Sequence, residues 1–216
     1  MKKLILILLI LVSFSCKYGN KENVKSENLE TINKSKEDKE PKVLNKLVLP
    51  SHTLWSFVRL SFEENTSSKE RLDAFKVTRT SIDETAYAVV NETPIIYGSK
   101  YRISINAKKG DNGHLFGLRA IGEYPHRIDA VFDLKNGLVK DNKSSGDFIE
   151  GRATIAPLEN DWYKCTIISE LDADMVKIIF GPTSGLRKTI VWEAQTKDFC
   201  DVFVVPSSLT IEELSH

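Results

Sequence analysis

The residues best suited to chemistry stand in one short stretch, residues 119–127, which reads RAIGEYPHR. It holds a flat aromatic ring, Tyr124, together with planar or charged hydrogen-bonding groups. These are Arg119, Glu123, His126 and Arg127. An aromatic ring can stack on the apolar face of a sugar, while guanidinium and carboxylate groups bind pairs of hydroxyls or an acidic sugar. The stretch is therefore a candidate ligand site, although an ordinary polar loop with its tyrosine packed on a sheet edge would have the same composition.

Trp55 is the best candidate for a second exposed stacking ring, because the residues around it do not show whether its side chain points into the core or outward. Trp192 alternates in phase with Ile190 and Ala194, which favours a core position. Other polar residues fall on the outward phase of the expected strands and would form a polar face if those strands were neighbours. They are Asn106, Arg119, Lys164, Thr166, Glu193 and Gln195.

Motifs of known enzyme classes are missing from the chain. The histidines, His52, His114, His126 and His216, are far apart and show no metal-ligand spacing. We expect no catalytic residues, no cofactor and no catalytic metal. The acidic runs 111–113 and 172–174 could donate oxygens to a structural calcium, although acidic turn residues more often only form turns.

Cys165 lies in the run ENDWYKCTII, where it shares a face with Tyr163 and Ile167. Three roles are open to it: filling the core, pairing with Cys200 in a disulfide, or acting as a nucleophile. A nucleophile needs a nearby base or cation, and no histidine is close in sequence. Core filling is favoured, and the disulfide stays open because an exported protein meets an oxidising compartment.

The elements that must position these residues are short runs of β-branched and aromatic residues separated by turn residues such as Asn136-Gly137 and Gly181-Pro182. Residues 101–108 alternate between apolar and polar, as in a sheet with one buried and one solvent-exposed face. This pattern predicts an all-β fold, a β-sandwich of two antiparallel sheets. The expected strands cover 55–62, 72–78, 86–91, 101–108, 115–121, 128–134, 152–156, 162–170, 175–180, 188–194 and 201–205.

The N-terminus, MKKLILILLILVSFSC, has two lysines before an apolar run that is too short to span a bilayer as a helix. It predicts a signal peptide over residues 1–15. The stretch SFSC resembles the lipobox of bacterial lipoproteins, which implies acylation of Cys16, and Lys17 after it implies the outer membrane. Ser13 stands where that motif usually has leucine.

Residues 17–46 mix lysine, glutamate, asparagine and serine with almost no apolar residue, so we expect 16–46 to be a lipidated, flexible linker. The remaining expected parts are a sandwich domain over 47–208 and a tail over 209–216. Lys plus Arg and Asp plus Glu both number 30, and no basic stripe with interleaved aromatics appears, which argues against nucleic acid as a partner.

Four stretches in order, YRISINAKKG, AVFDLKNGLV, IAPLENDWYKCTI and TIVWEAQ, resemble a jelly-roll domain of phage tail and particle proteins. That fold is similar to the carbohydrate-binding modules of polysaccharide hydrolases. Asp161 and Lys164 stand where the pattern usually has glycine and arginine. The resemblance implies a jelly roll, and by analogy the recognition of polysaccharides or surfaces.

Together these features predict a lipoprotein of the cell envelope, on its periplasmic or surface side, that acts as a non-catalytic carbohydrate-binding or adhesion module with a glycan as its ligand. A protein–protein interaction subunit of an envelope complex is the alternative. A polysaccharide lyase or hydrolase is a weaker one, since many carboxylate pairs could serve it.

Overall fold

The computed structural model of the chain describes residues 40–64 and 73–216, which form a single unit. The signal peptide, Cys16 and most of the predicted linker lie outside these residues. Within the described part of the chain there is no helix with the length and apolar character of a membrane span.

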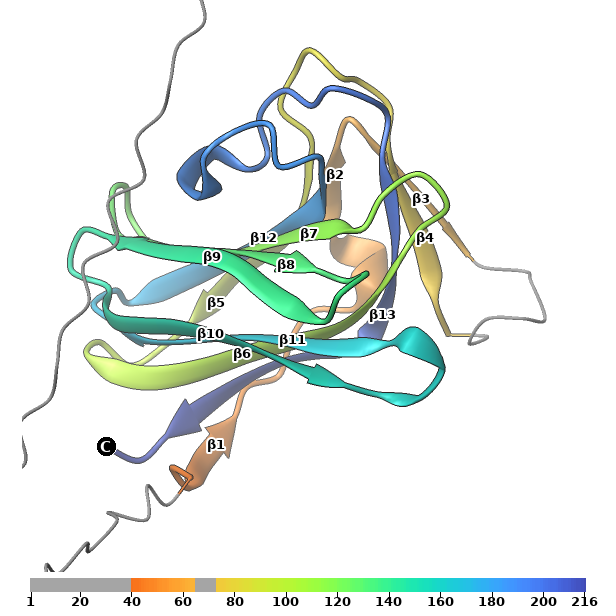
Figure 1. Ribbon diagram of the computed structural model, residues 1–216. Helices are drawn as coiled ribbons and strands as arrows, with labels where there is room; N and C mark the ends of the chain where they lie inside the picture. Colours follow the sequence, from red (N-terminus) through yellow and green to blue (C-terminus); the bar gives the residue numbers. More distant parts are fainter. Residues whose placement is uncertain (1–39, 65–72) are drawn as a thin grey trace, which may run out of the picture. The chain divides into compact units, whose positions relative to one another are not determined.

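Two antiparallel sheets pack face to face in a β-sandwich, as the strand pattern predicted, and the fold is the jelly roll that the resemblance implied (Figure 1). From β4 onward the chain crosses between the sheets several times, although β7, β8 and β9 follow one another in one sheet and β10 and β11 in the other. One sheet has the order β10-β11-β6-β13-β4-β3, with β1 also paired to β13, and the other has the order β2-β5-β12-β7-β8-β9. The strands are β1 (Val43–Lys46), β2 (Ser56–Val58), β3 (Leu60–Glu64), β4 (Phe75–Arg79), β5 (Tyr87–Pro94), β6 (Ser99–Lys109), β7 (Leu115–Ile121), β8 (Arg127–Asp133), β9 (Leu138–Ser145), β10 (Ile149–Pro157), β11 (Tyr163–Leu171), β12 (Met175–Thr183) and β13 (Asp201–Leu214).

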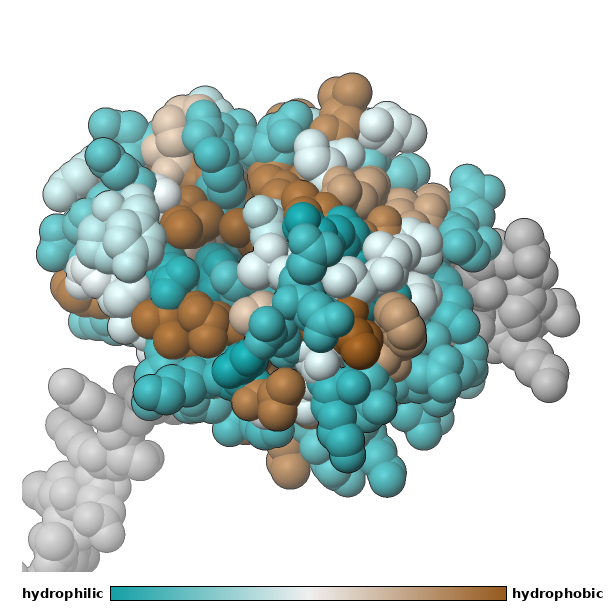
Figure 2. Space-filling view, turned by 90° about the horizontal axis from the view of Figure 1, so that it is seen from above, coloured by the Kyte–Doolittle hydropathy of each residue, from teal (hydrophilic) through white to brown (hydrophobic). Residues whose placement is uncertain are grey.

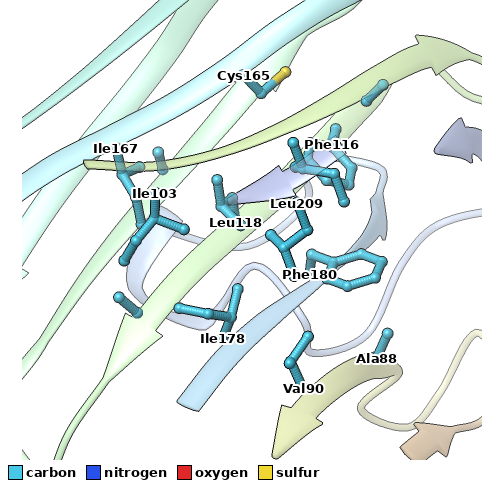
Figure 3. Close-up of a cluster of buried hydrophobic side chains, with 14 of the residues drawn as sticks. Ala88, Val90, Ile103, Phe116, Leu118, Cys165, Ile167, Ile178, Phe180 and Leu209 are labelled. Atoms are coloured by element: carbon cyan, nitrogen blue, oxygen red, sulfur yellow. The ribbon is translucent and has the colours of Figure 1, made fainter. Parts of the chain in front are cut away.

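The core lies between the two sheets, because alternate residues of each strand point inward. Ile103 and Ile105 of β6 face Phe116 and Leu118 of β7, and all four side chains are almost fully buried. Figure 3 shows Ile103, Phe116 and Leu118 together with Ile178 and Phe180 of β12, among other residues.

A third, partial layer covers the outer face of the second sheet. Residues 184–200, which include the short 3-10 helix η3 (Thr189–Val191), fold back over β7 and β8 at the top of Figure 1. Trp192 of this segment is buried on Leu115 and Val131, so it is a core residue as predicted, but in this outer cluster rather than between the sheets.

Several boundaries differ from the sequence prediction. Residues 43–46 are not linker, because Val43 and Lys46 of β1 pair with Leu214 and Glu212 of β13. Residues 209–214 are likewise not a tail, since they are the second half of β13. The predicted strand 188–194 is wrong, because this stretch forms η3 and the loop around it.

Candidate functional site

A groove of about 650 Å³ opens at one end of the sandwich, where the loops at the left of Figure 1 meet. Four connections line it: β5–β6, β7–β8, β9–β10 and β11–β12. We call it the tyrosine groove. Its lining residues are Glu92, Tyr97, Ile121, Gly122, Glu123, Tyr124, His126, Asp147, Asp172, Ala173, Asp174, Met175 and Lys177.

Backbone hydrogen bonds tie the loops of this groove to one another. The β5–β6 turn is held by Ile95 N–H donating to the Asp174 carbonyl at 2.9 Å and by Gly98 N–H donating to the Leu171 carbonyl at 3.0 Å. The buried Tyr101 hydroxyl accepts from Ile96 N–H at 2.8 Å. These bonds fix the backbone on either side of Tyr97, so the groove is preorganised.

The β7–β8 loop packs so closely on its neighbour that only glycine fits at residue 122. A Cβ on Gly122 would lie 2.7 Å from the Cβ of Ala173 and 3.3 Å from the Phe148 ring. The loop closes on itself through His126 N–H, which donates to the Glu123 carbonyl at 2.8 Å. Tyr124 is thereby held at the tip of a short, packed loop, and its peptide bond to Pro125 is cis.

Two tyrosine rings present their surfaces at the groove. Tyr124 is 76% exposed and Tyr97 is 62% exposed. The Arg127 guanidinium lies 5.9 Å from the centre of the Tyr124 ring, within the range of a cation–π contact that holds the ring in place. Each ring therefore offers a flat apolar face on which a ligand can stack.

His126 adds a hydrogen-bonding group of defined orientation. Its Nδ1 accepts a hydrogen bond from the backbone N–H of Asp147 at 2.9 Å, so this nitrogen carries no proton in that arrangement. The neutral imidazole then carries its proton on Nε2, which can donate to a ligand. The Asp147 carboxylate lies 3.6 Å from Nδ1.

Carboxylates dominate the charge of the groove. Five acidic side chains line it: Glu92, Glu123, Asp147, Asp172 and Asp174. The one lysine among the lining residues, Lys177, is paired with Glu92 at 2.8 Å. A negatively charged surface repels anionic ligands and offers acceptors for hydroxyl or amino groups.

Of the residues predicted for the site, Glu123, Tyr124 and His126 lie together in this groove. Arg127 supports Tyr124 from behind through the ring contact. The predicted role of Arg119 is wrong. Its side chain does point to the outer face of β7, as predicted. The segment 184–200 covers that face, however, and only 4% of the side chain is exposed.

Each of the three guanidinium nitrogens of Arg119 donates to a group within the protein. Its Nε donates to Asp129 at 2.5 Å, and its two terminal nitrogens donate to the Glu193 carboxylate at 2.9 and 2.8 Å. Nη2 also donates to the Ile190 carbonyl at 2.9 Å. Arg119 therefore fastens the outer segment to the sheet and is not available to a ligand.

Trp55 is not an exposed stacking platform, because only 7% of it is accessible. It follows the 3-10 helix η1 (His52–Leu54), and its ring meets Phe180 edge to face at 5.5 Å. Its indole N–H donates to the Pro50 carbonyl at 3.2 Å. The ring is thus a core residue at the start of the domain.

Cys165 fills the core, as its phase on the strand predicted (Figure 3). Burial raises the pKa of its thiol well above the ordinary value, which opposes a nucleophilic role. The disulfide alternative is wrong, since Cys165 and Cys200 are both free. Cys200 stands just before β13 against Gly113, and burial raises the pKa of its thiol to about 11.

The remaining polar residues do not form one face. Lys164 and Thr166 of β11 pair with Asn106 and Ser104 of β6 on the first sheet, whereas Arg119 lies on the second sheet and Glu193 on the segment that covers it. For calcium, Asp111 is engaged by Lys76 at 2.6 Å, and the residues at 172–174 line the groove. Residues 40–64 and 73–216 contain no group of three or more His, Cys, Asp or Glu side chains placed to hold a metal.

The sequence reasoning missed Tyr97 and Asp147. Each has a glycine next to it in the sequence, Gly98 or Gly146, which is the only local signal. In the structure these glycines have positive φ angles of 72° and 65°. Such glycines mark tight turns, and turns at the same end of a sandwich meet in space. The order of the strands in the sheets decides which turns lie at the same end of the sandwich. The sequence pattern does not predict that order.

No family model matches the chain, and no curated protein matches it in sequence. One solved structure, "CBM4 structure and function", aligns at a TM-score of 0.40 and 10% identity over 79% of this chain and 96% of that chain. A second is a glycoside hydrolase family 43 arabinoxylan arabinofuranohydrolase from Bacillus subtilis in complex with cellotetraose, at a TM-score of 0.37 and 12% identity. That match covers 74% of this chain and 25% of the enzyme's length.

Proposed function

We propose that this protein is a non-catalytic glycan-binding module and that its ligand lies in the tyrosine groove. The observation that carries the proposal is the pair of exposed rings, Tyr97 and Tyr124, on anchored loops in a groove lined by carboxylates. The rings supply stacking surfaces, and the carboxylates and His126 supply partners for hydroxyls.

The charge of the groove selects the class of glycan. Five carboxylates against one paired lysine disfavour uronic acids and sulfated sugars there. Neutral polysaccharides, or glycans with free amino groups, suit this surface. We therefore propose a neutral or amino-sugar glycan as the ligand of the tyrosine groove.

A binding role suits the groove better than hydrolysis. Glycosidases keep one carboxyl protonated by burying it, and they place it opposite a second carboxylate. Glu123, Asp147 and Asp174 are all exposed. Exposed carboxylates accept hydrogen bonds readily but lack the environment of a general acid.

We further propose that the module is attached to the outer membrane through acylated Cys16. The support is the N-terminal sequence alone, with its lysines, apolar run and SFSC stretch. Several acyl chains on one residue anchor stably, because each buried methylene adds about 0.8 kcal/mol.

Affinity electrophoresis in gels that contain a neutral polysaccharide, such as xylan, glucan or mannan, or the amino-sugar polymer chitosan, tests the glycan proposal. We expect retardation in at least one gel and a loss of affinity of about tenfold for Tyr97→Ala and for Tyr124→Ala. Phe199→Ala is the matched control, because Phe199 is also exposed (55%) but lies outside the groove.

Three results would oppose the proposal. Unretarded migration in every gel would favour a protein partner instead. Equal losses for all three variants would remove the ligand from the groove. Release of reducing sugar from a retarding polysaccharide would replace a binding module with an enzyme.

A further inference from the structure

A second groove, of about 600 Å³, lies on the outer face of the β2-β5-β12-β7-β8-β9 sheet, between β9 and the covering segment. We call it the basic groove. Its rim carries Lys140 and Lys143 from β9 and Arg187 and Lys188 from the segment, and its floor includes Val131 and Ile190. Figure 2 shows the side of the molecule that carries this segment, where patches of hydrophobic surface lie between hydrophilic side chains.

The cations of the rim are largely unpaired. All four are exposed, and no carboxylate in the described ranges, 40–64 and 73–216, forms an ion pair with Lys140, Arg187 or Lys188. Among the residues that the structure describes, Arg187 donates only to the neutral amide of Gln195. Four like charges around one groove repel one another unless an anion joins them.

Asp141 is the single acid among the described lining residues of the basic groove, and it is already engaged. The Asp141 carboxylate accepts a hydrogen bond from the Thr189 hydroxyl at 2.7 Å and lies 3.8 Å from Lys143 Nζ. It therefore offsets at most one of the four cations, and that one weakly because the pair is exposed. The groove keeps a net positive charge.

The wall that carries Arg187 and Lys188 is fixed in place. Arg119 holds the segment at the Ile190 carbonyl and the Glu193 carboxylate, and the Thr183 hydroxyl donates to the Trp192 carbonyl at 2.8 Å. The buried ring of Trp192 anchors the part of this segment that lies farther from the groove. A basic rim on a rigid wall is organised before any ligand arrives.

We propose that the basic groove is a second binding site, for a polysaccharide that carries carboxylate or sulfate groups. An anionic sugar matches both parts of the lining, since its ring face suits Val131 and Ile190 and its anions suit the lysines and Arg187. The volume falls within the range of about 300–1,000 Å³ typical of small-ligand sites. A hollow of this kind suits a chain of sugars better than a flat anionic membrane, although Leu186 is exposed beside it.

This site goes beyond the proposed function, because it needs neither tyrosine and selects the opposite charge. A protein with both grooves would bind neutral and anionic stretches of a glycan at different places. The two proposals therefore fail separately. Substitutions at Tyr97 and Tyr124 leave the basic groove intact, and substitutions at Lys140 and Lys188 leave the tyrosine groove intact.

Calorimetric titration of the full chain with dextran sulfate and with polygalacturonate, and with uncharged dextran as the matched polymer, tests the site. We expect binding of the two anionic polymers only, weakened about tenfold or more in Lys140→Gln/Lys188→Gln. The control Lys46→Gln/Lys109→Gln removes two exposed lysines of the other sheet and should change affinity less than twofold.

Three outcomes would overturn the proposal. Equal weakening by both double variants would mean attraction to overall charge. Absence of binding to either anionic polymer at low salt would leave the site without its ligand. Binding to phosphatidylglycerol vesicles, with no binding to the soluble anionic polymers, would assign the surface to a membrane.

Discussion

Asp129 is a buried acid that pairs with Arg119, the residue that holds the segment 184–200 on the sheet. It is fully buried, and it bonds Arg119 at 2.5 Å while Arg127 lies 3.3 Å away. Burial raises the pKa of the Asp129 carboxyl to about 6, and the two arginines offset only part of this desolvation. The same arginines serve the outer segment and Tyr124, so the charge of this residue bears on both grooves.

We expect Asp129 to lower stability as the pH rises from about 4 to about 6. In this window the folded protein binds the proton more tightly than the unfolded chain, so deprotonation disfavours the folded state. Asp129→Asn removes the titration. The free energy of unfolding of the wild type minus that of the variant should fall by on the order of 2 kcal/mol between pH 4 and pH 7. Urea unfolding at several pH values measures it, and a difference that rises with pH would refute the raised pKa.

For single residues, the sequence predicts which face of a strand a side chain points to, but not which other segment covers that face. Arg119 and Tyr124 stand five residues apart in the same cluster. The outward phase of Arg119 was predicted correctly, yet a segment more than sixty residues later covers it, while Tyr124 stays exposed. Coverage depends on the tertiary path of residues 184–200, which no local pattern encodes.

The segment 184–200 is the element that gives this sandwich its outer layer and one wall of the basic groove. It attaches through polar contacts to Arg119 and through the packing of Trp192 on the sheet. The ring lies where β7 has Gly117, and a Cβ there would come within 2.1 Å of the ring. The absence of a side chain at residue 117 therefore makes room for the layer.

Gly117→Ala should destabilise the protein by about 1–3 kcal/mol, because the new methyl group collides with a buried ring that has little room to move. Gly181→Ala is the matched control. Gly181 pairs with Gly117 across β12 and β7, and the nearest atom to its added Cβ would be 3.6 Å away. We expect that variant to stay within about 1 kcal/mol of the wild type. Urea unfolding compares them, and equal losses would mean that Trp192 does not occupy this space.

Most strands were predictable at the level of elements, and the exceptions share a physical cause. The runs of β6, β7, β8 and β11 have one or both faces apolar, so their patterns are clear. β9, with the sequence LVKDNKSS, is a polar edge strand, and all four residues of β1 are exposed. Pairing of these strands comes from backbone hydrogen bonds and their neighbours, which hydropathy does not report.

At the scale of the whole molecule, balanced composition conceals two oppositely charged grooves. The chain has 30 basic and 30 acidic residues, and these totals do not show where on the surface the charges gather. The fold separates the charges, with carboxylates at the loop end and lysines on the outer face of one sheet. A sandwich achieves this because the chain crosses between the sheets several times, which brings distant turns together at one end.

The proposed membrane attachment also belongs to this scale. If Cys16 carries the lipid, cells fed radioactive palmitate should yield labelled protein, and Cys16→Ser should abolish the label. Cys165→Ser is the control, because that buried thiol should not be acylated and its loss should leave the label unchanged. Label that persists in Cys16→Ser would disprove the anchor.

The most direct test of the central claim is an NMR titration of the isotope-labelled protein with oligosaccharides of a neutral polysaccharide that retards it in the gel. We expect saturable shifts in the signals of Tyr97, Tyr124 and His126, with the residues of the basic groove unaffected. Shifts confined to residues outside the tyrosine groove, or no shifts with any neutral glycan, would contradict the account.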